Sequence, residues 1–209
     1  MTEAPLTDIP VIVPAAGASR RMRGADKLML EAGGVPLLRR QVMRARAATR
    51  GLVIVALPPA PHPRWDSLAD LDVTGIPVPD AHEGMSAGLR RALDALGSDA
   101  RAVMILLPDL PDLTTEDLRL VLAAVAPADG TAMWCATTPD GRPGHPIVLH
   151  ASLFDELRAI RGDKGARAIR ENVARAGRLR GVPLGDDRAL RDLDTPEAWE
   201  AWRALQEKP

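Results

Sequence analysis

Short apolar runs alternate with longer helical patterns along the first 126 residues, and this alternation constrains the fold more than any other feature. Strands are expected at residues 9–14, 52–57, 76–78 and 102–107. Residues 102–107 are continuously apolar, as expected of a parallel strand that is covered on both faces. Helices are expected at residues 35–48, at 67–71, at 86–96 with Ser86 as the N-cap, and from Thr114 or Thr115 to 126.

Three consecutive strand–helix units predict an α/β fold with a mostly parallel sheet and helices on both faces. The rest of the chain is mixed. Strands are expected at 131–136, 147–150 and 179–184, a Gly/Pro loop at 140–146, two short helices, and a last helix from Pro196. No linker or repeat divides the 209 residues, so we predict a single domain over residues 1–209.

Composition excludes several classes of function. Lys and Arg number 27 against 28 Asp and Glu, so no strong positive field attracts nucleic acid or an anionic membrane. The apolar runs are far shorter than the roughly 20 residues of a membrane span. The single cysteine, Cys135, excludes an internal disulfide and a cysteine-based zinc site. Residues 1–5 lack a secretory signal pattern, and we expect a cytoplasmic protein.

The loop after the first strand, residues 15–27 (AAGASRRMRGADK), combines small residues with Arg and Lys. Small residues let backbone N–H groups approach a polyphosphate, and the basic side chains neutralise its charge. The loop matches neither the P-loop pattern nor the glycine fingerprint of dinucleotide-binding turns. An ordinary solvated strand–helix connection is the alternative interpretation.

Two aspartates are candidate metal ligands. Asp109 directly follows the most apolar strand, at the carboxyl edge where ligands bind in open α/β sheets. Mg²⁺ takes one or two carboxylates together with phosphate oxygens. A second carboxylate is expected from a remote segment, and Asp194 in a strand-to-helix turn qualifies. A turn role for Asp109, and helix capping by Asp194 or Thr195, are the alternatives.

Residues 15–27 resemble the A-A-G-x-S-x-R-M…K signature of the MobA-like nucleotidyltransferases, and most closely that of the molybdenum cofactor cytidylyltransferases. Five further motifs match in order. They are EGMSAGL at 83–89, LLPDLP at 106–111, GRPGHP at 141–146, GDKGAR at 162–167 and DLDTPE at 192–197. The resemblance implies a three-layer Rossmann-like nucleotidyltransferase fold, with a nucleotide-binding half at about 8–127 and an acceptor-binding half at about 128–209.

The resemblance also implies roles for individual residues. Catalytic roles fall to Lys27, Arg21 and Asp109, and metal binding to Asp109 and Asp194, with Asp192 the weaker candidate. Nucleotide contacts fall to Ala15, Ala16, Gly17, Ser19, Arg21, Lys27, Gly84, Met85 and Ser86. His145 is a candidate contact to the second substrate, with a structural loop histidine as the alternative. Arg23 makes this loop one residue longer than the family pattern.

These residues favour an Mg²⁺-dependent enzyme that joins a nucleotide from an NTP to an acceptor phosphate and releases pyrophosphate. CTP and molybdopterin are the substrates that the resemblance implies, with a molybdoenzyme or a chaperone as a possible protein partner. The alternatives are GTP as donor, and an isoprenoid-precursor phosphate, a phospholactate-type acid or a sugar phosphate as acceptor. A non-catalytic nucleotide-binding delivery protein is the rival from another class, whereas a dinucleotide-dependent reductase lacks its glycine fingerprint.

Overall fold

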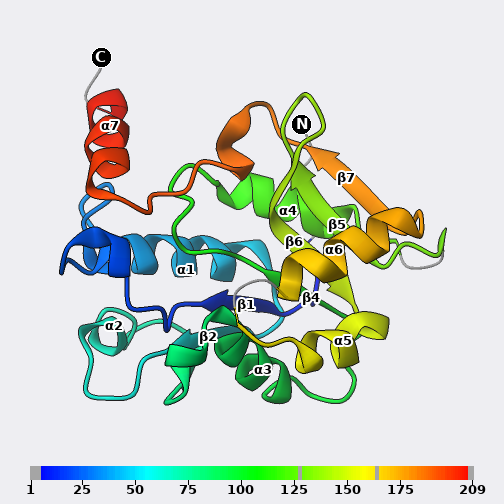
Figure 1. Ribbon diagram of the computed structural model, residues 1–209, viewed down its shortest axis with the longest axis horizontal. Helices are drawn as coiled ribbons and strands as arrows, with labels where there is room; N and C mark the ends of the chain where they lie inside the picture. Colours follow the sequence, from blue (N-terminus) through cyan, green and yellow to red (C-terminus); the bar gives the residue numbers. More distant parts are fainter. Residues whose placement is uncertain (1–5, 127–128, 163–164, 207–209) are drawn as a thin grey trace.

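One seven-stranded sheet forms the centre of the computed structural model, which describes residues 6–126, 129–162 and 165–206 (Figure 1). The strand order is β3-β2-β1-β4-β6-β5-β7. The strands are β1 (Val11–Pro14), β2 (Val53–Leu57), β3 (Thr74–Pro77), β4 (Ala102–Ile105), β5 (Met133–Thr137), β6 (Pro143–His150) and β7 (Leu179–Pro183). All of them are parallel except β6, which pairs antiparallel with both β4 and β5. The α/β prediction with a mixed second half is therefore confirmed.

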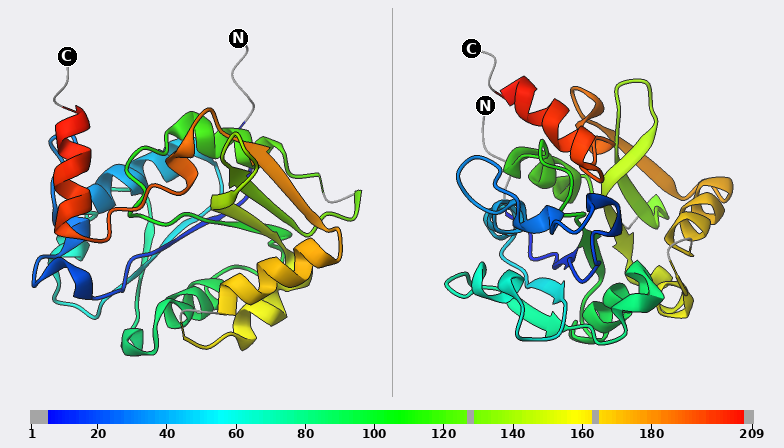
Figure 2. Two further views of the ribbon diagram at one scale, coloured as in Figure 1. Left: turned by 45° about the horizontal axis from the view of Figure 1, so that its top comes forward. Right: turned by 60° about the vertical axis from the view of Figure 1, so that its left-hand side comes forward.

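Helices cover both faces of this sheet and complete the three layers (Figure 2). They are α1 (Leu37–Ala48), α2 (Pro63–Asp66), α3 (Met85–Asp94), α4 (Thr115–Ala123), α5 (Phe154–Ala159), α6 (Gly165–Arg175) and α7 (Pro196–Gln206). Alternate residues of a strand point to opposite faces. Val11 and Val13 accordingly pack in the core beneath α1, α4 and α7, whereas Ile12 packs in the core beneath α3, α5 and α6. None of the described helices is long and apolar enough to cross a membrane.

The loops that follow β1 and β4 leave the same edge of the sheet, because these strands are parallel neighbours. The expected positions of α1 and α4 are confirmed. Thr114 caps α4 through a capping box in which its hydroxyl accepts from the Asp117 N–H and the Asp117 carboxylate accepts from the Thr114 N–H. This capping box fixes the start of α4 and so the end of the loop that follows β4.

Three local predictions are wrong. The short helix expected at 67–71 lies instead at Pro63–Asp66, where Pro63 occupies the first turn and His62 accepts from the Arg64 N–H. Gly84, with φ at 99°, is the N-cap of α3, and Ser86 lies inside the helix. The segment 140–146 is only partly a loop, because β6 already begins at Pro143.

Two segments discussed above lie outside the described residues. They are residues 1–5, to which the expectation about a secretory signal refers, and residues 163–164 of the GDKGAR motif.

Candidate functional site

The loop after β1 presents backbone N–H groups at the carboxyl edge of the sheet. In the part of the chain that the structure describes, the N–H groups of Ala16, Gly17 and Ala18 donate to no protein acceptor. The N–H of Ala15 is different, because it donates to the carbonyl of Ala56 at 2.8 Å. The expected nucleotide contact through the Ala15 amide is therefore wrong. The next three amides are the ones available to an anion.

Ser19 lies at the turn of this loop, with φ at 50°, in the left-handed region. Its hydroxyl accepts from the Lys27 N–H at 3.3 Å and lies 3.5 Å from the Asp26 carboxylate. The side chain thus joins the two ends of the loop. Arg23, the additional residue of the loop, also has a positive φ, and its guanidinium pairs with Glu197 at 2.5 Å.

Asp109, Asp192 and Asp194 form an acidic cluster at the same sheet edge. One oxygen of each carboxylate lies within 4.8 Å of the other two. A backbone hydrogen bond from the Leu193 N–H to the Asp109 carbonyl, 2.9 Å long, joins the two segments that carry them. Folding therefore brings together acids that lie more than eighty residues apart in the sequence.

Asp112 explains why the last segment of the chain returns to this edge. It lies in the loop after β4, accepts from the Trp202 indole N–H at 2.8 Å and pairs with Arg191 at 2.6 Å. Trp199 and Trp202 are buried and place α7 against the core beneath α1 (Figure 2). The segment that leads into α7 is thus held beside Asp109.

Lys27 joins the loop after β1 to the acidic cluster. Its ammonium lies 2.6 Å from Asp109 Oδ2 and 2.6 Å from Asp194 Oδ1, and its side chain is only 15% exposed. The exposed Arg21 adds a contact of 2.5 Å to the second oxygen of Asp194. Burial alone would lower the pKa of Lys27, but the charges and hydrogen bonds of Asp109 and Asp194 raise it above its usual value.

The two acids of the last segment differ in their proton affinity. Burial favours the neutral form of Asp194, yet the hydrogen bond and charge of Lys27 outweigh this and lower its pKa. The pKa of Asp192 is raised by burial, by its hydrogen bond with Asp194 and by the charges of Asp194 and Asp109. Asp194 is thus the more readily ionised carboxylate of the two.

The donor set fits a hard divalent cation. Mg²⁺ and Mn²⁺ bind carboxylate oxygens, and three such oxygens converge here. Asp109 Oδ1 is buried and has no hydrogen-bond partner among the described residues, so one oxygen is available to a cation. The Lys27 ammonium already occupies a cationic position between two of the acids.

Helix capping does not compete for Asp194. The hydroxyl of Thr195 accepts from the Ala198 N–H at 3.2 Å and so supplies the cap of α7. The carboxylate of Asp194 meets Lys27 and Arg21 instead. Thr195 therefore supplies the expected helix cap, and the metal role of Asp194 stays a prediction.

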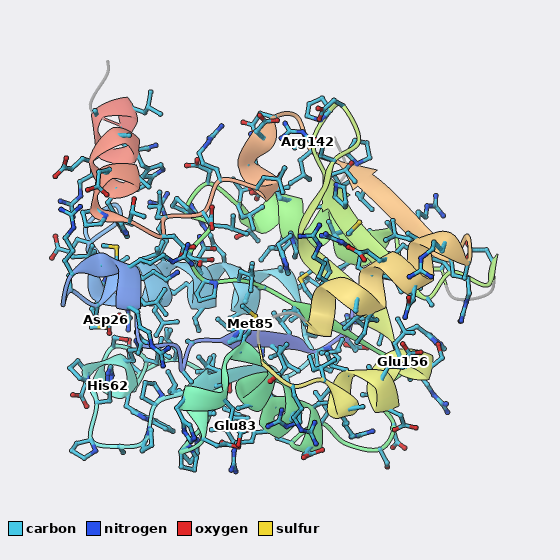
Figure 3. The ribbon with its side chains drawn as sticks, viewed as in Figure 1. Asp26, His62, Glu83, Met85, Arg142 and Glu156 are labelled. Carbon is cyan, nitrogen blue, oxygen red and sulfur yellow. The ribbon has the colours of Figure 1, made fainter. Side chains whose placement is uncertain are left out.

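The segment Gly84, Met85 and Ser86 opens α3 below β1 (Figure 3). The Met85 side chain is 43% exposed, whereas Ser86 is buried and its hydroxyl accepts from Arg90 Nη1 at 3.2 Å. Three nucleotide contacts were expected on this segment. One of the three residues, Ser86, already uses its hydroxyl for a hydrogen bond inside the protein. Gly84 and Met85 lie at the start of the helix.

His145 lies in β6, beside the end of β4, and not in a loop. Its ring bonds to the backbone of Ile105, and its Nδ1 is buried without a partner in the described structure. Burial lowers the pKa of His145 to about 4, so the imidazole is neutral at physiological pH. The residue is close enough to the cluster for its charge state to respond to Asp109.

Two residues of the site were not found from the sequence. Asp26 and Arg64 lie on neighbouring segments, the end of the loop after β1 and the start of α2, where Figure 3 labels Asp26 and His62. The Arg64 guanidinium contacts both Asp26 and the backbone of the loop. Arg64 lies in a Pro-rich stretch without periodicity, and no local pattern marks it as a partner of residues 38 to 49 positions earlier.

A hollow of about 520 Å³ lies two strands away from β4, at the same edge of the sheet. Its walls come from α6 and the ends of β5 and β7, and include Thr137, Thr138, Arg170, Ala174, Gly181 and Pro183. This hollow offers room for a ligand in the second half of the chain.

A mostly parallel sheet with free loop amides and an acidic cluster at the carboxyl ends of its strands places these groups where open α/β proteins bind their ligands. The chain belongs to the MobA-like NTP transferase family, whose domain model matches residues 11–178.

Among curated relatives, the purine catabolism protein PucB of Bacillus subtilis (strain 168) is 29% identical over 59% of this chain and 58% of its own length. The molybdenum cofactor guanylyltransferase of Shewanella baltica (strain OS155) is 27% identical over 74% of this chain and 75% of its own. The crystal structure of Rv0371c from Mycobacterium tuberculosis matches all of both chains at 27% identity, with a TM-score of 0.77. Rv0371c has also been crystallised with manganese.

Proposed function

We propose that this protein transfers a nucleoside monophosphate from an NTP to the phosphate of an acceptor, with release of pyrophosphate. The observation that carries the proposal is the meeting of Lys27 with Asp109 and Asp194 beside the amides of Ala16–Ala18. Nucleotidyl transfer needs a cradle for the triphosphate, cationic charge near the α-phosphorus and an acceptor placed in line. At this edge of the sheet, the amides of Ala16–Ala18 are candidates for the cradle, and Lys27 is a candidate for the cationic charge.

In this proposal the free amides of the loop bind the phosphate oxygens, and Arg21 and Lys27 neutralise their charge. If Asp109 and Asp194 held a divalent cation, the Lys27 ammonium would bond to phosphate oxygens instead of to these carboxylates. Ser19 acts through the loop, because its hydroxyl is already bonded to the Lys27 N–H. No protein nucleophile is required, since the acceptor phosphate attacks the α-phosphorus and pyrophosphate leaves.

The cation that we propose is Mg²⁺, held by Asp109 and Asp194, with Asp192 as their neighbour. When bound, it neutralises charge on the triphosphate and polarises the α-phosphoryl group. The manganese complex of Rv0371c supports a divalent metal in proteins of this kind. The unpartnered Asp109 Oδ1 supports its position in this chain.

CTP is the proposed donor, because Ala15–Gly17 and Gly84–Ser86 resemble the cytidylyl pattern. Guanylyl members more often carry L-A-G-G and G-P-L-A-G at these places, although Pro14 departs from both patterns. The proposed acceptor is molybdopterin or its molybdenum form, in keeping with the name of the Shewanella baltica relative. We propose that the acceptor uses the hollow between α6, β5 and β7 in the half at 128–209.

The test is pyrophosphate release by purified protein with Mg²⁺, molybdopterin and each NTP in turn. Turnover with CTP at least tenfold above that with GTP is expected, and equal or faster turnover with GTP would reverse the choice of base. Asp109→Ala should lower turnover by about 10³-fold or more, because it removes a proposed metal ligand. A protein that only binds and delivers nucleotide would show no turnover to lose.

A further inference from the structure

Arg64 is a buried cation beside the loop of residues 15–27, and the sequence motifs give it no role. The residue is only 2% exposed. A guanidinium has five N–H donors in a fixed planar fork, and here each of them has an acceptor. Nη1 donates to the carbonyls of Ala15 and Gly17, at 2.6 and 2.9 Å. Nε and Nη2 donate to the two oxygens of Asp26, at 2.9 and 2.6 Å, and Nη2 also lies 3.5 Å from the Ser19 hydroxyl.

These contacts determine which way the loop peptides face. A trans peptide is planar, and its C=O and N–H point in opposite directions. The carbonyls of Ala15 and Gly17 turn inward to Arg64. The N–H groups of the same two peptide units belong to Ala16 and Ala18. They therefore point away from Arg64, and these are two of the amides that have no acceptor within the described structure.

The ion pair between Arg64 and Asp26 also fixes the backbone around Lys27. The Asp26 carboxylate caps the short 3₁₀ turn Lys27–Met29 by accepting from the Leu28 N–H at 3.1 Å. This turn is the element from which Lys27 reaches Asp109 and Asp194. Arg64 thus holds both ends of the loop, the amides at one end and the lysine at the other.

The segment that carries Arg64 is itself anchored. The indole N–H of Trp65 donates to the Pro58 carbonyl at 2.8 Å, and the Trp65 ring packs on Gly75 of β3, where a Cβ would lie 2.5 Å from the ring. The contacts of Trp65 with Pro58 and with Gly75 of β3 therefore hold the neighbouring Arg64 in place. A buried ion pair adds little stability compared with apolar residues of the same size, so burial alone does not account for an arginine here.

We propose that Arg64 is a positioning residue, which holds the loop of residues 15–27 in the conformation that binds a triphosphate. The inference rests on the proposed nucleotide function of that loop. Arg64 touches no substrate in this proposal. It aims the amides of Ala16 and Ala18 outward and, through Asp26, fixes the origin of the Lys27 side chain.

The experiment compares wild type with Arg64→Met, Arg64→Lys and a matched control, Arg39→Met. Arg39 also makes a fork pair with an aspartate, Asp70, and donates to a backbone carbonyl, that of Ser67, but it does not touch the loop. Calorimetric titration with inorganic tripolyphosphate and with CTP plus Mg²⁺ measures affinity. Hydrogen exchange at the amides of Lys27, Leu28 and Met29 measures the order of the loop without any ligand.

The expected result for Arg64→Met is at least tenfold weaker binding of tripolyphosphate and faster exchange at those three amides. Arg64→Lys should recover only part of the affinity, because an ammonium cannot reproduce the fork. Arg39→Met should bind within about twofold of wild type. If Arg64→Met does not fold, Asp26→Asn provides the same test, with weaker binding and faster exchange expected.

Wild-type affinity and wild-type exchange in Arg64→Met would overturn the positioning role and leave the nucleotide function intact. An equal loss of affinity in Arg39→Met would also overturn it, because the effect would then be one of general stability. No binding of CTP or tripolyphosphate by wild type would overturn the nucleotide function itself. The exchange measurement would then still show whether Arg64 orders the loop.

Discussion

Replacing Lys27 with Met should destabilise the metal-free protein and at the same time improve its affinity for a divalent cation. The Lys27 ammonium is 2.6 Å from both Asp109 and Asp194, in a partly buried site where the lysine and both acids are at most 18% exposed. It is the cation that bridges the two acids, while the exposed Arg21 contacts only Asp194, at 2.5 Å. Met keeps most of the aliphatic stem and removes only the charge and its donors.

The size of the effect follows from the spacing of the acids. Two carboxylate charges about 5 Å apart repel each other by about 3 kcal/mol at an effective dielectric constant of about 20. The acids can limit this by taking up a proton, which Asp192 does most easily because its pKa is already raised. We therefore expect the free energy of unfolding to fall by about 2–4 kcal/mol, which urea titration of the metal-free variant measures.

The same variant should bind Mn²⁺ at least tenfold more tightly than wild type when no nucleotide is present. In wild type a cation must displace the lysine from two charge-assisted hydrogen bonds, whereas in Lys27→Met Asp109 has lost this counter-charge and Asp194 keeps only the exposed Arg21. Isothermal titration calorimetry with Mn²⁺ gives both affinities. Arg39→Met is the control, since its ion pair with Asp70 lies away from the cluster and its loss should leave the Mn²⁺ affinity unchanged.

Equal Mn²⁺ affinities for wild type and Lys27→Met would refute the reasoning, because the lysine and the metal would then not share these carboxylates. A more stable metal-free variant would refute it as well, since the acids would not need the ammonium as a counter-charge.

Three further predictions concern residues around the site. Between pH 7 and about pH 4.5, the free energy of unfolding should fall by about 2 kcal/mol less in His145→Gln than in wild type. The folded pKa of His145, about 4, lies below the ordinary 6.5, so the unfolded chain takes up the proton first as the pH falls. Urea titration at both pH values measures the two falls, and equal falls would contradict the prediction. Gly144→Ala should lower the free energy of unfolding by about 1–3 kcal/mol, because its Cβ would lie 2.3 Å from the Ala189 carbonyl oxygen, and an unchanged urea midpoint would contradict that clash. Cys135 should react with iodoacetamide about a hundredfold more slowly in the native protein than in urea, because burial raises its pKa to about 11; mass spectrometry follows the reaction, and similar rates in both states would count against a buried thiol.

The parts of the fold that were predictable are those in which local chemistry and burial agree. The continuous apolar run that became β4 and the Thr114–Asp117 capping box are signals carried by neighbouring residues. Topology also predicted that the loops after β1 and β4 leave the sheet at one edge, because parallel strand–helix units bring their carboxyl ends together. The structure adds that β1 and β4 are direct neighbours, which brings the loop of Lys27 close to Asp109.

The errors fall where a tertiary partner outweighed the local pattern. Pro143 and Gly144 are typical of loops, yet they open β6, where Pro143 pairs with Thr137 of β5 and Gly144 packs closely on Ala189. Ser86 resembled an N-cap, but Gly84 supplies the backbone conformation with φ at 99° that begins α3. The contact of Gly144 with Ala189 leaves no local pattern because the two residues are far apart in the sequence, whereas Gly84 is a local signal only two residues from Ser86.

Arg64 illustrates a more general limit of reading a site from motifs. Motif residues of the loop such as Gly17 and Arg21 are exposed, and the conformation that makes them useful depends on what lies behind them. Small residues such as Ala15–Gly17 permit many backbone conformations, and permissiveness alone does not hold three amides in one direction. The fork of Arg64 selects one of these conformations by engaging two carbonyls and an aspartate at once. In a chain of this family, an arginine on the element after β2 is therefore the residue to examine when the loop matches the signature but binds nucleotide weakly.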